Sequence, residues 1–460
     1  MQILLAPSAP FWSVGDHSKR AGQFAPAPAR QPTKTITHER SNFMGDWLAV
    51  DFGTSNSAAA YAEDGAIKRI QLEENSDTVP TAVFFSLNDA SMAIGSVANA
   101  ALIDRLEGRY MRSLKRVLGT SLMAERRTIL DRKLDFYDIV SAFLKIIKDR
   151  SEKQSGRHFD KVVAGRPVLF DSKDAEINER AATDLERCYN MAGFDEVVFL
   201  PEPEAAALSV IDQIKPGDLG IVVDIGGGTS DFTVFKKTGH GIEVAASHGV
   251  RLGGTDFDRA MNLQFIMPCI GHGHLIRHGM NGETIAAPNA IFQDLATWEK
   301  IHLLYTQKNL SLAKGLVQDA VEPAIFQRLH RAIDWQLGHE IAFLAEQSKI
   351  ASNGTNPSTH IELGLLESGL STPMAPTEID AVFLPFTETL AETLDDTLAN
   401  AQVERDAVSH VVPVGGASLM RLVQSAISKT VPEASVVDTP IFTAVVDGLA
   451  LHSGAVSAGT

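Results

Sequence analysis

The sequence predicts an α/β fold in which two similar lobes face each other across a phosphate-binding cleft. The main observation is a pattern that occurs twice: an apolar strand ends in an aspartate, a glycine-containing turn follows, and a second apolar strand leads away. One copy spans residues 48–61 and the other spans residues 221–235. Glycines leave backbone N–H groups uncovered, so a phosphate group can approach them closely. Two copies therefore indicate a duplicated scaffold that holds one polyphosphate from both sides.

Aspartates beside both turns give the predicted cleft groups that can hold a cation. Asp51 closes the first strand of one copy, while Asp224 and Asp231 flank the turn of the other. Carboxylates repel phosphate, but they can hold a divalent cation directly or through its water ligands. The chain has no Gly-x-x-x-x-Gly-Lys-Ser/Thr motif, and each turn leads into a strand instead of a helix. The sequence therefore predicts a cation-assisted phosphate site that differs from a P-loop.

Length, charge and cysteine usage limit the classes of protein. The chain has 460 residues, enough for two or more domains, and no run approaches the ~20 apolar residues that span a bilayer. Its net charge of −16 argues against a general nucleic-acid binder, so neither a nucleic acid nor a membrane is expected as a partner. Cys188 and Cys269 form no Cys-x-x-Cys pair. Free thiols are typical of the reducing cytoplasm, where we expect the protein to act.

The chain divides into four predicted segments. Residues 1–43 are rich in Pro and Ala and show no period, so we expect disorder there, with Met44 as an alternative start. Lobe I is expected over residues 44–217. Lobe II is expected over residues 218–436, with a helical insert at about 260–345. Residues 437–460 are expected to form a final helix that returns to lobe I.

Hydrophobic spacing and turn residues predict the elements of these segments. Besides the hairpins at 48–61 and 221–235, strands are expected at 79–85, 162–169, 197–200, 361–363, 381–384 and 411–414. Helices are expected at 135–153, 175–192, 386–402, 419–429 and 442–452, and most of 260–350 is expected to be helical, with loops at 271–282 and 286–289.

Three further features carry candidate functional groups. Gly415 and Gly416 lie at a strand-to-helix junction, where a bare backbone lets a nucleoside lie flat. Lys115 is a basic residue inside an apolar stretch, and Glu202 lies between two prolines before an alanine-rich helix. Taken alone, each has a structural alternative: a tight turn, a solvated lysine, or an acid that the macrodipole favours at a helix N-terminus.

In chain order, these pieces resemble the nucleotide-binding domain of the Hsp70 family, within the wider actin-like ATPase superfold. The resembling motifs are residues 51–57, 115–119, 201–207, 224–231, 252–258, 346–349 and 414–418. The resemblance covers about residues 46–455. It implies duplicated ribonuclease H-like lobes with a nucleotide cleft between them, and it implies ATP/ADP and Mg²⁺ as cofactors, with K⁺ as a further cation.

The resemblance also implies a role for each matching residue. Lys115 would lie by the γ-phosphate, and Glu202 and Asp231 would orient the attacking water or the cation shell. Asp51 and Asp224 would hold Mg²⁺ through water. Contacts to the phosphates would come from Gly53, Thr54, Ser55, Asn56, Gly226, Gly227, Gly228 and Thr229. Ribose and adenine would be framed by Gly253, Gly254, Glu346, Lys349, Gly415, Gly416 and Ala417.

The sequence departs from the family in four places, one of which is a stretch between Asp258 and Glu346 that is longer than usual. Leu419 stands where the family has the arginine that stacks on adenine, and Ile350 follows Lys349 where an arginine is usual. Cation–π contacts to the base would then be lost. The sequence also ends directly after the last helix of the ATPase domain, so the resemblance is to the short bacterial Hsp70-like proteins that lack a peptide-binding domain.

The leading functional prediction is Mg²⁺-dependent ATP binding and slow ATP hydrolysis that opens and closes the lobes, with a protein partner or client implied by the resemblance. Three alternatives remain: a small-molecule kinase of the same superfold, an actin-like filament protein, and a pseudo-ATPase that binds nucleotide without cleaving it. A separate cluster, His272, His274 and His278, could in principle bind zinc. A polar glycine-rich loop is the favoured interpretation, because no acidic residue follows before Glu283.

Overall fold

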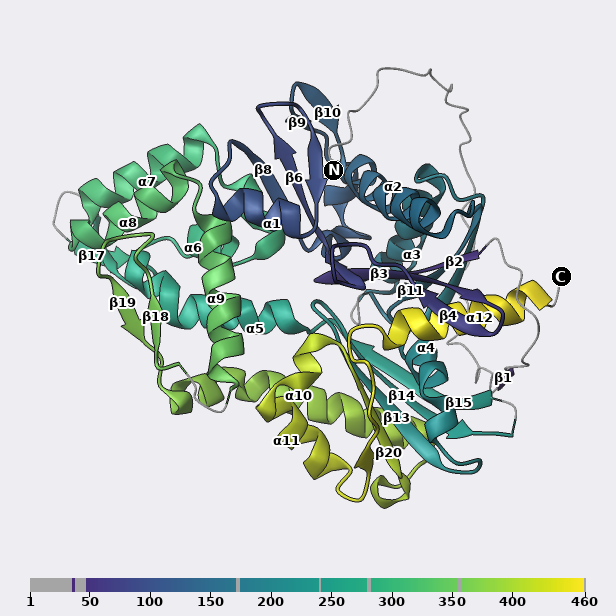
Figure 1. Cartoon of the computed structure of the whole chain (residues 1–460). Helices are drawn as coiled ribbons and strands as arrows, with labels where there is room; N and C mark the ends of the chain where they lie inside the picture. Colours follow the sequence, from purple (N-terminus) through teal and green to yellow (C-terminus); the bar gives the residue numbers. More distant parts are fainter. Residues whose placement is uncertain are drawn as a thin grey trace, which may run out of the picture.

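The computed structural model describes residues 35–37, 47–170, 174–239, 241–278, 283–354 and 358–458. Two mixed β-sheets form the centres of two lobes (Figure 1). Helices cover the sheets and also lie between them, so the prediction of an α/β fold is confirmed. The first sheet has the order β12-β11-β2-β3-β4, with β5 paired to β3, and the second has the order β1-β15-β14-β13-β20-β21.

The two sheets share a topology. The strands of the first are β2 (Trp47–Phe52), β3 (Asn56–Glu63), β4 (Ala66–Arg69), β5 (Thr78–Pro80), β11 (Lys161–Arg166) and β12 (Glu196–Pro201). Those of the second are β1 (Thr35–Thr37), β13 (Leu219–Ile225), β14 (Ser230–Lys237), β15 (Gly241–Val250), β20 (His410–Val414) and β21 (Ser435–Val436). In each sheet, the strand that carries the turn aspartate pairs antiparallel with the next strand and parallel with a later one. The two predicted glycine turns therefore occupy equivalent places in the two sheets.

A shared helical layer lies between the sheets. It consists of α4 (Glu202–Ser209) and α12 (Ala444–Ala458), which pack against each other and against strands of both sheets. The helices cross closely, because a Cβ atom on Gly448 would lie only 1.7 Å from the carbonyl oxygen of Ala205. With helices on both faces, the central strands are apolar along their length. Val222 and Val223, for example, have no exposed surface.

Amphipathic helices cover the outer faces. In lobe I these are α2 (Phe136–Ser155) and α3 (Ala175–Met191), and in lobe II they are α10 (Pro376–Ala401) and α11 (Arg421–Thr430). The ends of α2 follow from local chemistry. Asp135 and Asp138 form a reciprocal capping box at its start, and Gly156 ends it in the left-handed conformation with φ of 69°.

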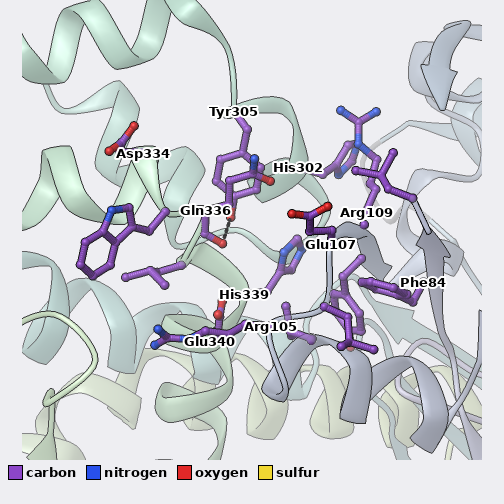
Figure 2. Close-up of a pocket in the computed structure, with 17 residues that line it drawn as sticks. Phe84, Arg105, Glu107, Arg109, His302, Tyr305, Asp334, Gln336, His339 and Glu340 are labelled. Carbon is purple, nitrogen blue, oxygen red and sulfur yellow. Dashed lines mark hydrogen bonds between the residues drawn. The ribbon is translucent and has the colours of Figure 1, made fainter. Parts of the chain in front are cut away.

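Each lobe carries an additional unit, and the two units meet. In lobe I, the small sheet β7 (Met92–Ile94), β6 (Ala82–Ser86) and β8 (Gly108–Arg112) packs with α1 (Ser96–Ile103). In lobe II, the helices are α5 (Gly254–Met261), α6 (Ala290–Leu295), α7 (Gln307–Asp319), α8 (Pro323–Asp334) and α9 (Gly338–Ser352). A hydrophobic cluster that includes Phe84, Tyr110, Trp298 and Ala342 joins the two units. Figure 2 shows the edge of this junction.

Several expected elements differ from the structure. Residues 381–384, expected as a strand, lie inside α10, because Ile379, Phe383 and Leu390 follow helical spacing and Pro385 is accommodated within the helix. The expected loop at 271–282 contains β16 (Leu275–His278), which pairs with β17 (Glu283–Ala286). The final helix begins at Ala444 instead of residue 442, and α11 begins at Arg421 instead of residue 419.

The described part of the N-terminal segment is a short strand. Thr35–Thr37 form β1 and pair with β15, whereas the rest of the segment 1–43, for which we expected disorder, lies outside the described residues. Among the helices that the structure describes, none is both long and apolar enough to cross a bilayer.

Candidate functional site

The two glycine turns lie against each other between the sheets. A Cβ atom on Gly227 would lie 2.3 Å from Ser55 Oγ, and one on Gly228 would lie 2.9 Å from Thr54 Oγ1. The hydroxyls can rotate away, but Thr54 Cβ and Ser55 N would also lie within 3.2 Å of a Cβ atom on Gly227, so glycine favours this close approach of the second turn to the first. The turns that follow β2 and β13 therefore face a common space, as the duplicated pattern predicts.

This space is a narrow cleft. One cavity of about 80 Å³ is lined by residues of both turns, by Lys115 and Glu202, and by Gly415 and Gly416. A neighbouring cavity of about 20 Å³ is also lined by Thr54, Lys115 and Thr229. Pockets for small-molecule ligands typically measure ~300–1,000 Å³. The two turns therefore leave little space between the lobes, and we call this arrangement closed.

A buried ion pair lies in the cleft. Lys115 Nζ lies 2.5 Å from Glu202 Oε1, and both side chains are buried. Lys115 belongs to a 3₁₀ turn that starts after Ser113, a left-handed residue with φ of 60°, while Glu202 is the first residue of α4. Burial lowers the pKa of Lys115, but the carboxylates of Glu202 and Asp51 outweigh it, so the net pKa is raised and the side chain stays charged. The solvated-lysine alternative is therefore wrong.

Three aspartates surround this ion pair, and their environment disfavours their charged form. Burial raises the pKa of Asp51 to about 7, with repulsion from Glu202 as the second cause. Burial also raises the pKa of Asp231 to about 8 and that of Asp224 well above its ordinary value. Lys115 is the neighbouring cation that opposes all three shifts. One ammonium group is therefore too little charge for four buried carboxyl groups.

The excess of buried carboxyl groups over positive charge in the cleft fits a hydrated cation. Asp231 Oδ1 accepts a hydrogen bond from the Val168 N–H at 2.9 Å, whereas its Oδ2 is buried without a partner among the described residues. A divalent cation with its water shell would supply both charge and hydrogen-bond donors. No three His, Cys, Asp or Glu side chains of the described chain converge as direct metal ligands. That Asp51 and Asp224 hold Mg²⁺ through water stays a prediction.

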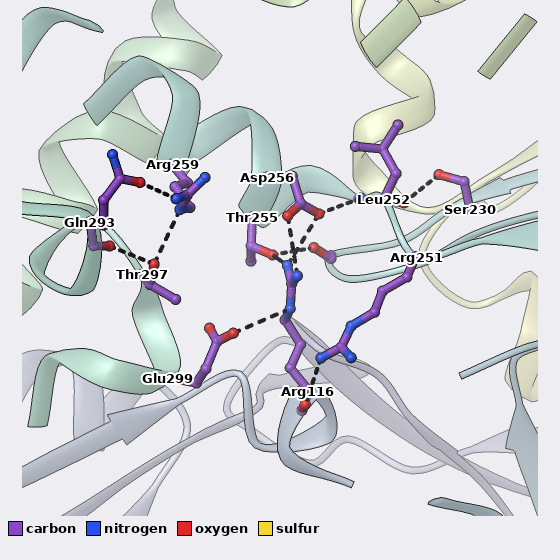
Figure 3. Close-up of polar contacts among 12 residues, drawn as sticks. Arg116, Ser230, Arg251, Leu252, Thr255, Asp256, Arg259, Gln293, Thr297 and Glu299 are labelled. Carbon is purple, nitrogen blue, oxygen red and sulfur yellow. Dashed lines mark hydrogen bonds and ion pairs between the residues drawn. The ribbon is translucent and has the colours of Figure 1, made fainter. Parts of the chain in front are cut away.

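Arg116 connects the lobes beside the cleft, as Figure 3 shows. Its guanidinium group donates to Thr255 Oγ1 and pairs with Asp256 at 3.1 Å and with Glu299 at 3.6 Å. Arg251 of lobe II donates in turn to the carbonyl oxygen of Arg116 at 3.1 Å. Sequence reasoning did not assign Arg116 a role. Its position directly after Lys115 in an apolar stretch was the available signal.

Gly253 and Gly254 support the second glycine turn. The N–H of Gly254 donates to the carbonyl oxygen of Gly226 at 2.9 Å, and the N–H of Thr255 donates to that of Gly227 at 2.8 Å. A Cβ atom on Gly253 would lie 2.5 Å from the nitrogen of Gly228. These glycines hold the shape of the phosphate turn, and neither lines the cavity between the turns.

Glu346 and Lys349 of α9 are both engaged in ion pairs. Glu346 accepts two hydrogen bonds from Arg112 of β8, at 2.5 and 2.8 Å, and the Arg112 guanidinium lies 4.7 Å from the centre of the Trp298 ring. Lys349 Nζ pairs with Asp258 at 2.6 Å. Arg112 belongs to lobe I and Glu346 to lobe II, so this pair is a second connection between the lobes. Sequence reasoning missed Arg112, because its partner is more than two hundred residues away.

The third glycine motif lies at the other end of the cleft. Gly415 has φ of 77°, and a Cβ atom there would lie 2.3 Å from the carbonyl oxygen of Ile225. Gly415 and Gly416 line the cavity, whereas Ala417 is buried beside it. Leu419 and Ile350, the two departures from the family pattern, are 41% and 62% exposed. Apolar side chains thus stand at the surface where the resemblance placed arginines.

The histidine cluster forms no common site. His272 Nε2 lies 3.0 Å from Asn289 Oδ1, and His274 Nδ1 lies 3.2 Å from Glu322 Oε1. His278 ends β16, and it is exposed. His272 and His274 therefore have separate partners among the described residues.

Comparison with known proteins finds a matching family model and several curated relatives. A family model described as "Hsp70 protein" matches residues 47–274. The chaperone protein DnaK of Ureaplasma urealyticum serovar 10 is 31% identical over 216 residues, which cover 46% of this chain and 34% of that protein. The chaperone protein DnaK of Nitrosopumilus maritimus is 23% identical over 420 residues, which cover 90% of this chain and 57% of that protein. The chain therefore spans between a third and three fifths of the length of these curated relatives.

Proposed function

The chain belongs to the Hsp70 family and has its actin-like ATPase fold, and from this premise we propose that it binds ATP and ADP between its lobes and hydrolyses ATP slowly. The observation that carries the proposal is the buried Lys115 between two facing glycine turns, surrounded by Asp51, Glu202, Asp224 and Asp231. This set provides backbone N–H groups and a cation for phosphate, and carboxylates for a hydrated metal and an attacking water.

In the proposed mechanism, the two turns hold the polyphosphate from opposite lobes. Their N–H groups and the hydroxyls of Thr54, Ser55 and Thr229 donate to phosphate oxygens. Bound Mg²⁺ would neutralise the β- and γ-phosphate oxygens, and Asp51 and Asp224 would hold its water ligands. Phosphoryl transfer needs placement and charge stabilisation more than covalent chemistry, which suits a site built of turns and fixed charges.

Lys115, Glu202 and Asp231 would act on the reacting atoms. In the closed cleft Lys115 is bound to Glu202 at 2.5 Å. A γ-phosphate competes for the ammonium group, and the freed Glu202 can then accept a hydrogen bond from the attacking water. Asp231 presents a buried Oδ2 without a partner among the described residues, so it can position the same water. Lys115 thereby stabilises the charge that develops on the leaving oxygens.

Opening and closing of the lobes would be the output of the cycle. The cleft of about 80 Å³ must open for nucleotide exchange. The interlobe contacts of Arg116 and Arg112 would break in that motion. We propose that a protein partner or client reads the resulting change, in the cytoplasm. A net charge of −16 supports a protein partner over a nucleic acid or an anionic membrane.

Isothermal titration with ATP, ADP and GTP, each with and without Mg²⁺, tests the proposal. We expect Mg²⁺-dependent binding of the adenine nucleotides. Single-turnover hydrolysis by Lys115→Ala should fall by about 10²–10³-fold while nucleotide binding is retained. Lys308→Ala, an exposed lysine of α7, is the matched control and should keep full activity. Unchanged turnover in Lys115→Ala would remove Lys115 from the mechanism, and absence of nucleotide binding would end the proposal.

A further inference from the structure

A second and larger cavity lies between the lobes, outside the nucleotide cleft. Its volume is about 420 Å³. One wall comes from β6, β8 and the end of α1 in lobe I, and the other comes from α8, α9 and the segment before α7 in lobe II. None of the residues assigned to nucleotide lines it. Its volume is in the usual range for a small-molecule site, ~300–1,000 Å³.

Two histidines that line the cavity carry buried hydrogen-bonding atoms without partners among the described residues. His302 and His339 are 4% and 2% exposed, and the Nε2 atom of each has no partner among the described residues. Burial, Arg109 and Arg127 lower the pKa of His302 to about 3. Burial lowers the pKa of His339 well below its ordinary value, and His302 and Arg112 lower it further. Both imidazoles are therefore neutral and can donate a single N–H. A buried donor without an acceptor is costly, so a ligand acceptor would satisfy it.

An unpaired guanidinium group lies next to these imidazoles. Arg109 lines the cavity beside His302, and no carboxylate of the described residues lies within ion-pair distance of it. Burial lowers its pKa, and the neighbouring Arg127, which pairs with Glu125, lowers it further. Glu107 also lines the cavity, but it is exposed to solvent, which weakens its repulsion of an anion without removing it. The most buried charges at this side are positive, so this side favours an anion.

The rest of the cavity suits an aromatic ring that carries a donor group. Phe84, Tyr110 and Tyr305 line it, and both tyrosine hydroxyls already have partners, Asn99 Oδ1 at 2.7 Å and the Gln336 carbonyl at 3.0 Å. Phe84 and Tyr110 are almost fully buried, and the Tyr110 ring packs edge-on against His339 with centroids 4.9 Å apart, so the half-buried Tyr305 ring offers the most aromatic surface to a ligand. Figure 2 shows Glu340 on the side away from Arg109. Its Oε2 atom is buried without a partner among the described residues, and it can accept a hydrogen bond from a ligand.

We propose that this cavity binds a small aromatic carboxylate, whose carboxylate is held by Arg109 and the His302 N–H, whose ring lies among Phe84, Tyr110 and Tyr305, and whose hydroxyl or amino group reaches Glu340. Such a ligand contacts lobe I and lobe II at once. Binding of the ligand therefore stabilises the closed arrangement of the lobes, in which both walls are present. The site stands apart from the proposed ATP cleft and does not depend on it.

Calorimetric titration of the full chain without nucleotide tests the site. The probes are 4-hydroxybenzoate and 4-hydroxybenzamide, which have nearly the same shape and differ in charge. We expect the acid to bind at least about tenfold more tightly, because the charged form gains charge-assisted hydrogen bonds. Equal affinity of the two probes, or binding of neither at millimolar concentration, would overturn the proposal.

Two variants with opposite expected effects identify the anion-binding residue. Arg109→Gln should weaken 4-hydroxybenzoate binding at least about tenfold. Glu107→Gln removes a like charge and should tighten it by about two- to fivefold. Arg180→Gln, an exposed arginine of α3, should leave it unchanged. A gain of affinity cannot come from misfolding, so Glu107→Gln tests the anion-binding side of the cavity even if Arg109→Gln fails to fold. If Glu107→Gln does not bind 4-hydroxybenzoate more tightly, the assignment of the carboxylate to this side is overturned.

Discussion

The four carboxyl groups around Lys115 predict an unusual dependence of stability on pH. Burial raises the pKa of Asp51 from 3.8 to about 7. Between these two values the folded protein holds a proton that the unfolded chain releases. The free energy of unfolding therefore falls as pH rises through this window, because the folded state binds more protons than the unfolded state. This is the reverse of the usual behaviour of a paired aspartate.

The magnitude follows from the size of the shift. Each pH unit inside the window changes the free energy of unfolding by about 1.4 kcal/mol for one group. Asp51→Asn removes the titrating proton while it keeps the shape of the side chain. Between about pH 5 and about pH 7, the wild type should therefore lose roughly 2 kcal/mol relative to Asp51→Asn, because the slope falls off as pH approaches the folded pKa. The variant becomes the more stable protein at neutral pH if its stability matches that of the wild type at pH 5.

Urea unfolding of both proteins across this pH range measures the difference. Asp396→Asn, an exposed aspartate of α10, is the control and should follow the wild type at every pH. Millimolar Mg²⁺ should reduce the loss in the wild type, because a cation stabilises the ionised carboxylates. Parallel curves for wild type and Asp51→Asn would show that Asp51 is not protonated in the folded protein, and the argument from charge imbalance would fail.

Three further predictions concern the lobe junction, the adenine region and the shared helical layer. Arg112→Met leaves Glu346 partly buried without its bidentate partner, so the free energy of unfolding should fall by about 3–5 kcal/mol in urea, and Arg112→Met/Glu346→Leu should recover most of it. Leu419→Arg adds a guanidinium group at a 41% exposed position and should strengthen ATP binding by about 0.5–2 kcal/mol in calorimetry. Gly448→Ala places a Cβ atom 1.7 Å from the Ala205 oxygen and should lower stability by about 4 kcal/mol or more in thermal unfolding.

Each of these has a control within the chain. Arg405→Met breaks an exposed ion pair with Asp395 and should cost no more than about 1 kcal/mol. Leu384→Arg, at another exposed leucine, should leave ATP affinity unchanged. Gly315→Ala in α7 meets open space and should stabilise the helix slightly. Equal effects in a test variant and its control would refute the corresponding contact argument.

The sequence could predict the fold where local chemistry decides it. The two hairpins follow from apolar runs that end in an aspartate and a glycine turn, and α2 follows from helical spacing with a capping box. The strand expected at 381–384 was wrong, because a short apolar run of Ala, Val, Phe and Leu fits either period. Only the longer spacing, through Leu390, Leu394 and Leu398, identifies it as the buried face of α10.

The candidate site could be predicted in part for the same reason. The residues of the two turns, with Lys115 and Glu202, lie in motifs of their own, and they line one cleft in the structure. The interlobe pairs of Arg112 and Arg116 could not be predicted, because each joins segments more than a hundred residues apart. An arginine in a strand or turn gives no local sign of a distant carboxylate.

The distribution of charge explains why closure and ligand binding should be linked. In the closed cleft the turns touch, and Lys115 is the cation that faces Asp51, Glu202 and Asp224. A buried carboxylate that lacks a partner is costly, so this arrangement weakens the closed state from within. Arg112 and Arg116 oppose that cost with ion pairs outside the cleft. A hydrated cation bound with phosphate would attract the carboxylates that otherwise repel one another in the cleft. Closure of the lobes would then be favoured most strongly when the cleft is filled.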